Sequence, residues 1–499
     1  MLTRRVFLGA LGGAVSMGQP AFGQSLEFRA GTAEVDISPQ SLPAIRNGGI
    51  VEASCDRVLD PLKARALAMS AGGETVTIVV VDSCMIPREL CDEAKALAAK
   101  RAPVKAGRIL ISATHTHSAP SVMDFCLGSR SQKDYAAMLP ARIADAVVAA
   151  QSRMEPAKAG CGRAEAPGHT FCRRWIARPG KEIVDPFGER TGIAHMNPGY
   201  RHPDFLGPAG PVDTGLTFMA IESRDGRPIA LVANFGNHYF GMRGGFSGDY
   251  FAVFSRMMAE RLRARPDFIA MMSQGTSGDA NRFDFRLPAV TQVTIDEYTS
   301  GLVDLIEAAY RNISFSAAVP LAMAESRITL GRRVPNAQRL AWAKEINAKR
   351  GERRPKDRIE VYAEQAAWIA ENPSEEVVLQ AVRIGDLGIT ACPNEVYAVT
   401  GLKLKAQSPL ATTMNISLAN GASGYIPPPE QFPLGGYTTW PSRTAGLEIE
   451  AEPKILEGLL GLLENVSKQP RKPLAGDPYP AEIRERIRAA LTAAGKSVG

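Results

Sequence analysis

The chain has 499 residues, of which 45% are hydrophobic and 22% charged, and this composition is typical of a globular protein with a large buried core. Its formal net charge of +6 is spread over the whole length, which argues against nucleic-acid binding, because that function concentrates basic residues on one face. The one basic cluster, residues 332–358, falls in a helical pattern. It indicates a solvated helix face, with an anionic surface partner as the alternative.

The first residues, MLTRRVFLGALGGAVSMGQPAFGQ, pair Arg4 and Arg5 with a short apolar segment that is followed by small residues. This pattern predicts a twin-arginine export signal at residues 1–23, with an ordinary cleaved signal as the alternative. The apolar run is well short of the ~20 residues that span a bilayer, and no later segment is long enough. We therefore expect a soluble protein, periplasmic or secreted, with no transmembrane segment.

Short β-rich runs then alternate with amphipathic helical segments, which predicts an α/β fold, with α+β as the alternative. The predicted strands are residues 75–83, 108–114, 229–236, 268–274, 377–393 and 412–419. Their nearly continuous apolar runs indicate layered sheets whose strands are covered on both faces by other layers. We predict one large domain, residues 24–467, followed by a linker and a terminal helix in residues 468–499.

The seven cysteines form no CxxC pair and are odd in number, so they do not indicate a zinc–cysteine site. At least one thiol should be free. An oxidising compartment would permit a disulfide such as Cys161–Cys172 or Cys84–Cys91, but the sequence does not decide between these pairings.

Titratable side chains follow the ends of four predicted strands. They are His115 and His117 after 108–114, His238 after 229–236, Asp279 after 268–274, and Glu395 after the run 377–393. Functional groups of sheet proteins gather at strand ends. Imidazole and carboxylate ligands from distant segments are typical of a catalytic zinc site that keeps room for a water. Hydrogen bonding at a strand end is the alternative role for each residue taken singly.

His115 and His117 are two residues apart in the stretch ATHTHSAP. Side chains at this spacing share a face only while a strand continues, and Ser118 and Pro120 indicate that the chain is already turning. We therefore expect only one of the two histidines to be a metal ligand, with the other beside the metal.

Several segments together resemble the neutral ceramidase family, the neutral and alkaline non-lysosomal ceramidases. They include AGTAEVDISP, ATHTHSAP, VANFGNHYF, GTSGDA, ACPNEVYAV and NGASGYIPPPEQFPLGGY, and they span most of residues 28–446. The resemblance implies that residues 24–467 are a catalytic domain. It also implies a catalytic zinc held by His115, His238, Glu395 and Tyr425. Without the resemblance, Tyr425 would be interpreted as packing in a proline-stiffened loop.

The same resemblance implies roles for further residues. The implied catalytic residues are His117, Asp279, Tyr437 and Arg174, and the implied substrate-binding residues are Arg173, Asn281 and Trp440. His117 would polarise the substrate or stabilise the developing oxyanion, and Tyr437 would help to stabilise the amide oxygen. Which of Arg173 and Arg174 stands near the scissile bond stays open. The loop from Tyr425 to Trp440, rich in proline, glycine and aromatics, would form a wall over the substrate.

One departure from the family follows Asp279. Where the family carries a serine that is regarded as important for catalysis, this chain has Asn281. Attack by a serine is therefore not carried over, and Ser277 is out of register. We expect zinc-assisted hydrolysis of an N-acyl amide bond, in a ceramide or a related small molecule or lipid, with zinc lowering the pKa of a water toward ~7.

Two other functions stay open at this point. One is a zinc esterase or amidase that acts on another envelope metabolite. The other is a non-catalytic envelope protein that uses the same scaffold for binding, and Asn281 is the residue that favours it. The oligomeric state and any peripheral contact with a membrane surface are not decided by the sequence.

Overall fold

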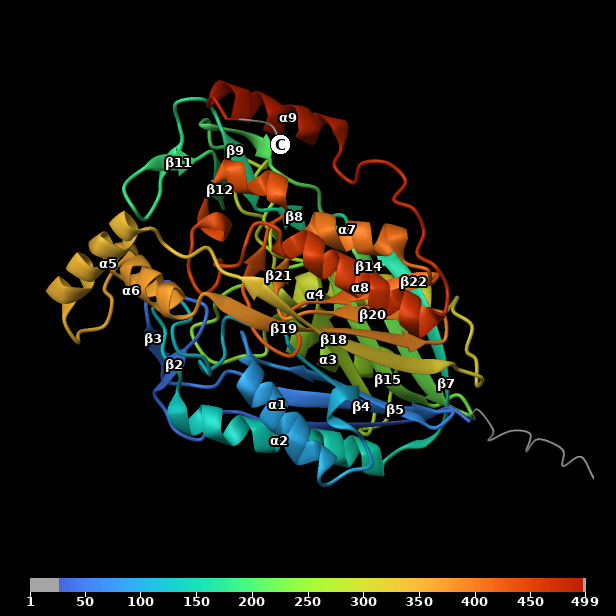
Figure 1. Ribbon diagram of the computed structural model, residues 1–499. Helices are drawn as coiled ribbons and strands as arrows, with labels where there is room; N and C mark the ends of the chain where they lie inside the picture. Colours follow the sequence, from blue (N-terminus) through green and yellow to red (C-terminus); the bar gives the residue numbers. More distant parts are fainter. Residues whose placement is uncertain (1–26, 497–499) are drawn as a thin grey trace, which may run out of the picture.

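The computed structural model describes residues 27–496, so the predicted export signal lies outside the described residues. These residues form two β-sheets packed face to face, with helices over both outer faces (Figure 1). The predicted α/β fold, with layered mixed sheets covered by helices, is confirmed. No helix in this range is both long and apolar enough to cross a bilayer.

The larger sheet has eight strands and is mostly antiparallel, with one parallel pair at each edge. In spatial order its strands are β16 (Ile269–Gln274), β15 (Pro228–Phe235), β14 (Gly215–Ser223), β7 (Glu155–Glu165), β1 (Arg29–Asp36), β4 (Lys63–Ala71), β5 (Glu74–Val81) and β6 (Ile109–Ala113). The predicted strands 75–83, 108–114, 229–236 and 268–274 are therefore all present. Their order places the predicted strands at the two edges of the sheet.

The smaller sheet has four strands and includes one correction to the sequence analysis. Its order is β18 (Leu321–Gly331), β19 (Ser374–Ile384), β20 (Leu387–Ala391) and β22 (Thr412–Ile416). The run 377–393, predicted as one strand, is two antiparallel strands, because the chain reverses at Gly385 and Asp386. Gly385 has φ +61°, a conformation that glycine adopts without steric cost and that suits a tight hairpin turn.

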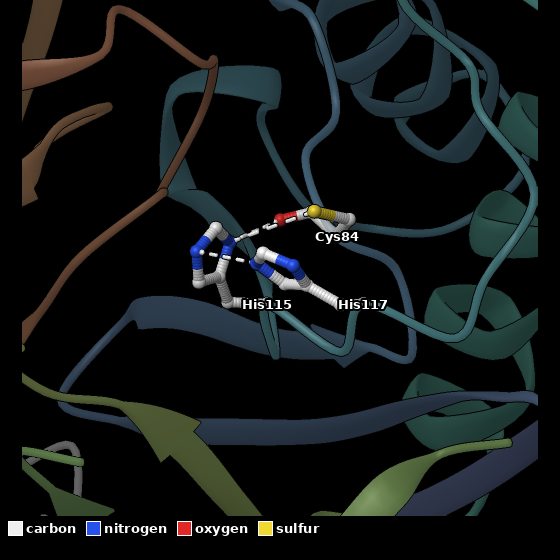
Figure 2. A group of neighbouring side chains, drawn as sticks. All are labelled: Cys84, His115 and His117. Carbon is white, nitrogen blue, oxygen red and sulfur yellow. Dashed lines mark hydrogen bonds between the residues drawn. The ribbon is translucent and has the colours of Figure 1, made fainter. Parts of the chain in front are cut away.

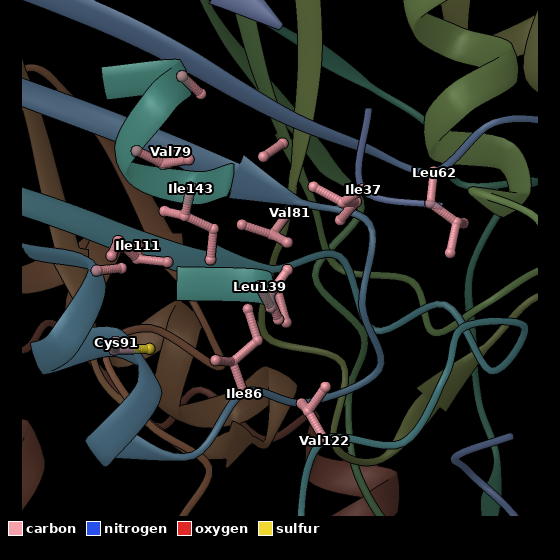
Figure 3. Packing of buried hydrophobic residues seen from close by; sticks show 14 of the residues in the cluster. Ile37, Leu62, Val79, Val81, Ile86, Cys91, Ile111, Val122, Leu139 and Ile143 are labelled. Atoms are coloured by element: carbon pink, nitrogen blue, oxygen red, sulfur yellow. The ribbon is translucent and has the colours of Figure 1, made fainter. Parts of the chain in front are cut away.

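The core lies in three apolar layers, one between the sheets and one under each set of helices. Leu67 of β4, Val232 of β15 and Val382 of β19 are among the side chains buried between the two sheets. Helices α1 (Arg88–Ala99) and α2 (Lys133–Ser152) cover the outer face of β1 and β4 to β6, and Figure 3 shows their side chains packed on those of β5 and β6. Helices α3 (Asp249–Arg261) and α4 (Ile295–Tyr310) cover β14 to β16. Helices α7 (Ala398–Gln407) and α8 (Ala451–Ser467) cover the smaller sheet.

Short elements connect and surround these layers. They are β2 (Ala44–Arg46), β3 (Ala53–Cys55), η1 (Ala106–Arg108), β8 (Phe171–Cys172), β9 (Arg174–Ala177), β10 (Ile183–Val184), β11 (Arg190–Gly192), β12 (Ala194–Met196), β13 (Phe205–Pro208), β17 (Ala280–Asn281), β21 (Glu395–Val396), β23 (Tyr425–Ile426), η2 (Pro429–Leu434) and η3 (Tyr437–Thr439).

Two helical segments lie outside the layers (Figure 1). Helix α5 (Ala337–Arg350), which contains much of the basic cluster, pairs with α6 (Arg358–Glu371) and buries only Ala343, as expected for a solvated helix face. The predicted terminal helix is α9 (Ala481–Ala493), and it packs onto η2 and β9 through its apolar side chains.

All seven cysteines lie in the described part of the chain, and each is a free thiol. The pairing of Cys161 with Cys172 is not formed, because Cys161 lies within β7 of the larger sheet whereas Cys172 lies in β8, which pairs with β17 instead. Cys84 and Cys91 are likewise unpaired.

Replacement of Leu67 tests the importance of the layer between the sheets. Leu67 is fully buried there, so Leu67→Ala should lower the free energy of unfolding by about 2–5 kcal/mol through lost burial and an unfilled cavity. Leu474→Ala is the matched control, because Leu474 is 39% exposed and its truncation should change stability by less than about 0.5 kcal/mol. Equal effects in chemical denaturation would contradict this account of the core.

Candidate metal centre

The ends of β6, β15 and β20 converge at one end of the two sheets. His115 follows β6, His238 follows β15, and Glu395 opens β21 directly after β20. All three side chains are buried. Their ligand atoms lie within 4.8 Å of one another, which is close enough to hold one metal ion. We call these three residues the metal-capable group. The structure thus brings together side chains that are separated by as many as 280 positions in the sequence.

His115 has a strained backbone and a defined ring orientation. Its φ is +69°, which is uncommon for a residue other than glycine and is concentrated at functional sites. Its backbone N–H donates to Ser83 O at 2.9 Å, and its ring Nδ1 lies 2.9 Å from Cys84 O. Since only a protonated Nδ1 can bond a carbonyl oxygen, this contact leaves the lone pair on Nε2 free to bind a metal.

Three atoms that can bind a metal surround Nε2 of His115. It lies 3.1 Å from His238 Nε2, 3.3 Å from His117 Nε2 and 3.3 Å from Glu395 Oε2. Burial, and next the charge of Arg173, lowers the pKa of His238 well below its usual range. Burial, and next His115, does the same to the pKa of His117. Neutral imidazoles are the form that binds metals.

The donor set fits a zinc ion. Glu395 Oε2 is buried and accepts no hydrogen bond from any residue in the range 27–496, and a buried carboxylate without a donor is costly unless a cation compensates it. Two imidazoles and one carboxylate are a ligand set that is typical of catalytic zinc, which keeps a position for water.

Cys84 lies beside the Nδ1 edge of the His115 ring (Figure 2). Its sulfur is 3.8 Å from His115 Nδ1, whereas the metal-capable group faces Nε2. Burial raises the pKa of the Cys84 thiol well above its usual value, and only a thiolate is a good metal ligand. Cys84 therefore contributes to the site through its backbone carbonyl.

Tyr425 stands beside the metal-capable group. It pairs with Glu395 in the parallel contact of β21 with β23, and its hydroxyl accepts a hydrogen bond from Arg173 Nη2 at 3.1 Å. Burial raises the pKa of Tyr425 well above its usual value, and Glu395 raises it further, while Arg173 acts in the opposite direction. The buried guanidinium is also held by Gly278 O at 2.9 Å.

Arg173 and Arg174 point in different directions, as neighbouring side chains of an extended segment do. Arg173 faces Tyr425 and the metal-capable group. Arg174 is buried on the other side, where its Nε and Nη2 each lie 3.1 Å from Gln431 oxygens in η2. The structure thus places Arg173 at the site, whereas Arg174 ties β9 to the 425–440 loop.

The other predicted residues of the 425–440 loop lie at different distances from the metal-capable group. The ring of Tyr437 packs edge-on against Tyr425, with ring centroids 5.7 Å apart. Trp440 is buried against Tyr362 of α6. Tyr437 is thus next to a predicted ligand, while Trp440 packs the 425–440 loop against α6.

Asp279 and Asn281 lie outside the metal-capable group and bond the chain itself. Asp279 Oδ1 accepts the N–H of Ala398 at 2.8 Å, and this N–H opens α7, where an anion is favoured by the helix dipole. Burial raises the pKa of Asp279 to about 6. Asn281 donates to Asn197 Oδ1 at 2.8 Å and accepts from the Phe283 N–H at 3.0 Å, so its amide holds the turn that follows β17.

Two residues beside His117 were not found by the sequence analysis. The ring of Tyr239 stacks on His117 with centroids 3.9 Å apart, and its position directly after His238 is a signal that could have indicated it. Gly48 has φ +96°, and a Cβ placed there would lie 2.3 Å from His117 Nδ1. No sequence pattern indicated Gly48, because its contact with His117 spans two separate loops.

Comparison with known proteins places this geometry on a known fold. No model of a protein family matches the sequence, and no curated protein matches it. Among solved structures, the neutral ceramidase of Pseudomonas aeruginosa aligns with a TM-score of 0.64 and 14% identity, over 91% of this chain and 77% of that one. A ceramidase complexed with C2 aligns with a TM-score of 0.65 and 13% identity, over the same shares of the two chains. The chain therefore has a neutral ceramidase-like fold.

Gly48→Ala tests the packing around His117. The new Cβ would clash with the imidazole, and φ +96° would be strained, so His117 should be displaced while His115, His238 and Glu395 keep their places. Bound zinc should be unchanged, and turnover of any substrate should fall by about 10-fold or more. Gly180→Ala is the control, since Gly180 also has a positive φ but nothing lies near its Cβ position. An equal loss of turnover in Gly48→Ala and Gly180→Ala would show that a clash with the His117 ring is not its cause.

Asp279→Asn tests the buried carboxylate at α7. Because the pKa of Asp279 is raised from 3.8 to about 6 in the folded protein, the wild type loses stability as pH rises between about 4 and 6. Asparagine keeps the acceptor without the charge. The variant should therefore gain stability relative to wild type over this pH range, by at most about 3 kcal/mol, and match it near pH 4. Urea denaturation at several pH values measures this, and a difference that does not vary with pH would exclude Asp279 as the titrating group.

Proposed function

We propose that this protein is a zinc-dependent hydrolase that cleaves an N-acyl amide bond in a ceramide or a related N-acyl compound. The observation that carries the proposal is the convergence of His115, His238 and Glu395 from three strand ends, on a fold shared with neutral ceramidases. We propose Tyr425 as the fourth ligand, and its pairing with Glu395 in the contact of β21 with β23 supports this role. When bound there, zinc would lower the pKa of a water and polarise the acyl carbonyl.

Each residue around the ligands has a role in this reaction that follows from its position. The ring of His117 lies 3.3 Å from that of His115 at their Nε2 atoms and is held between Gly48 and Tyr239, and this position supports a role in donating a proton or hydrogen bond to the reacting group. Arg173 is buried and positively charged beside Tyr425, and it would stabilise negative charge on the amide oxygen as the bond breaks.

Tyr437 would donate its hydroxyl hydrogen to the same oxygen from the neighbouring position. Asp279 would act indirectly. It accepts the N–H of Ala398 at the start of α7, three residues after Glu395, and so fixes the segment that carries this ligand. Asn281 and Trp440 would shape the walls of the site, and Arg174 would hold the 425–440 loop.

Hydrolysis without a serine nucleophile is part of the proposal. Both polar groups of the Asn281 side chain are bonded within the chain, and Ser277 Oγ accepts a hydrogen bond from Gln274. Neither side chain is activated by a base, as a nucleophile must be. Attack by water is the remaining route. We also propose that residues 1–23 direct the protein to the periplasm or outside the cell.

Asn281 stands where the neutral ceramidase family carries a serine, and this difference favours two alternative functions. A zinc esterase or another amidase would use the same ligands, and a binding protein would use the same scaffold without turnover. Assays with N-acyl amides, the corresponding acyl esters and ceramides separate them. Cleavage of esters alone would favour the esterase, and retained zinc with no turnover of any compound would favour the binding protein.

Alanine variants of the two histidines test the division of roles. His115→Ala should lose both zinc and turnover, because it removes a ligand. His117→Ala should retain zinc while kcat/KM falls by about 100-fold or more, the scale expected for loss of a positioned acid–base or oxyanion partner. Zinc content by elemental analysis, the melting temperature and turnover are measured on each variant.

His202→Ala is the control for these variants, since His202 is exposed and should retain both zinc and turnover. Equal zinc retention in His115→Ala and wild type would remove His115 from the metal site. Parallel losses of melting temperature and active protein in both variants, with no selective effect on zinc, would show instead that the histidines only support the fold.

A further inference from the structure

A cavity of about 310 Å³ lies beside the strand pair β8 and β17. Its lining includes Phe171, Tyr200, Arg282, Phe283, Val293 and Tyr298. Phe171 is two residues before Arg173, and Arg282 directly follows Asn281. β8 and β17 pair Phe171 with Asn281, so the cavity is built beside the segment that carries Arg173.

The Arg282 side chain is held in place by two aromatic rings. Its guanidinium carbon lies 4.1 Å from the centroid of the Phe240 ring and 4.2 Å from that of Phe283. Its Nε donates to Phe240 O at 2.8 Å. Cation–π stacking on both faces and one hydrogen bond fix the plane of the guanidinium. This preorganised edge can bind an anion with little further loss of conformational freedom.

The terminal nitrogens of Arg282 have no partner in the described part of the chain. Neither Nη1 nor Nη2 makes a hydrogen bond to residues 27–496, and none of their carboxylates forms an ion pair with Arg282. The side chain is nevertheless partly buried. A guanidinium that is oriented, partly desolvated and unpaired favours an anionic ligand with bidentate geometry.

The carboxylates that line the cavity are already occupied. Asp284 accepts hydrogen bonds from Arg286 at 2.8 and 2.9 Å, and Glu297 accepts from the Thr294 N–H and hydroxyl at 2.8 Å in a capping box. The guanidinium edge of Arg282 is therefore the charged group of the described lining whose hydrogen-bonding capacity is free.

We propose that this cavity binds an anionic group, a carboxylate or a phosphate, on the amine part of the substrate. The inference rests on the proposed amide hydrolysis and names its substrate class. The anion belongs to the amine part because the acyl part of such compounds is apolar. Phe240, whose ring stacks on Arg282, lies two residues beyond His238. The anion is therefore separated from the scissile carbonyl by several bonds.

Matched pairs of substrates test this proposal. N-lauroyl-ε-aminocaproate is compared with its primary amide, and N-lauroyl-phosphoethanolamine with N-lauroylethanolamine, so that each pair differs only in the anion. Wild type should show a kcat/KM about 10-fold or more higher for the anionic member of at least one pair. The pair that shows it identifies the anion as carboxylate or phosphate. N-lauroylglycine, whose carboxylate is too close to the carbonyl, should show less preference over its amide.

Variants of Arg282 link the preference to the cavity. Arg282→Gln should abolish the preference mainly through KM and leave kcat/KM for the neutral compounds within about 2-fold, while Arg282→Lys should restore part of it. Arg265→Gln removes the same charge from an exposed position before β16, at the opposite end of that strand from the site, and should keep the full preference. No preference in wild type, or one that survives Arg282→Gln, would overturn the proposal.

Binding measurements separate this proposal from the proposed hydrolysis. Calorimetric titration of the same pairs into zinc-free protein reports binding without turnover. If no compound is cleaved but the anionic members bind more tightly in an Arg282-dependent manner, the anion site stands and the hydrolase proposal fails. If amides are cleaved with no dependence on charge or on Arg282, the hydrolase proposal stands and the anion site is rejected.

Discussion

The candidate site depends on the hydrogen bonds by which residues 417–420 join the two opposite edges of the eight-stranded sheet. Ser417 N–H donates to Gln274 O at the end of β16 at 3.0 Å, and Leu418 O accepts from Ala113 N–H at the end of β6 at 3.1 Å. The edges curl toward each other and toward the smaller sheet. Because of this closure, His115 and His238 are 3.1 Å apart at their ring nitrogens although they follow strands near opposite edges. The same contacts cover edge strands that would otherwise expose unpaired backbone groups.

Backbone strain gathers at this closure. His115, Leu418 and Asn420 all have positive φ, at 69°, 52° and 59°. Such conformations persist only where the surrounding contacts determine them. Asn420 is fixed from both sides, since its N–H donates to Ile111 O at 2.7 Å and its amide donates to Gln380 at 2.8 Å. The bridging segment and the first predicted ligand are therefore held by one network, which links the stability of the fold to the geometry of the site.

Charges of both signs lie at the metal-capable group and around it. Glu395 is buried and its Oε2 accepts no hydrogen bond among residues 27–496, while Arg173 is a buried guanidinium that bonds neutral oxygens. Around them, Asp279 is bound at the start of α7, and Arg282 is stacked between two rings. Two arginines and two carboxylates thus lie around the same strand ends.

The sequence by itself determined several strands and indicated where a metal site would lie. Apolar runs located β5, β6, β15 and β16, and the histidines and carboxylates after them indicated a metal site, because apolar periodicity and strand-end position are local properties. The resemblance to neutral ceramidases indicated the fold that the solved structures then showed.

The tertiary structure decided what depends on distant segments. The run 377–393 is mostly apolar, so the sequence analysis did not detect the hairpin turn at Gly385 that divides it into two strands. The orientation of Arg173 toward Tyr425, the use of the Asn281 amide in a turn and the unpaired edge of Arg282 each depend on partners far away in the sequence. Such partners are set by the curl of the sheet and the closure at residues 417–420, and no local pattern in the sequence encodes which edges meet.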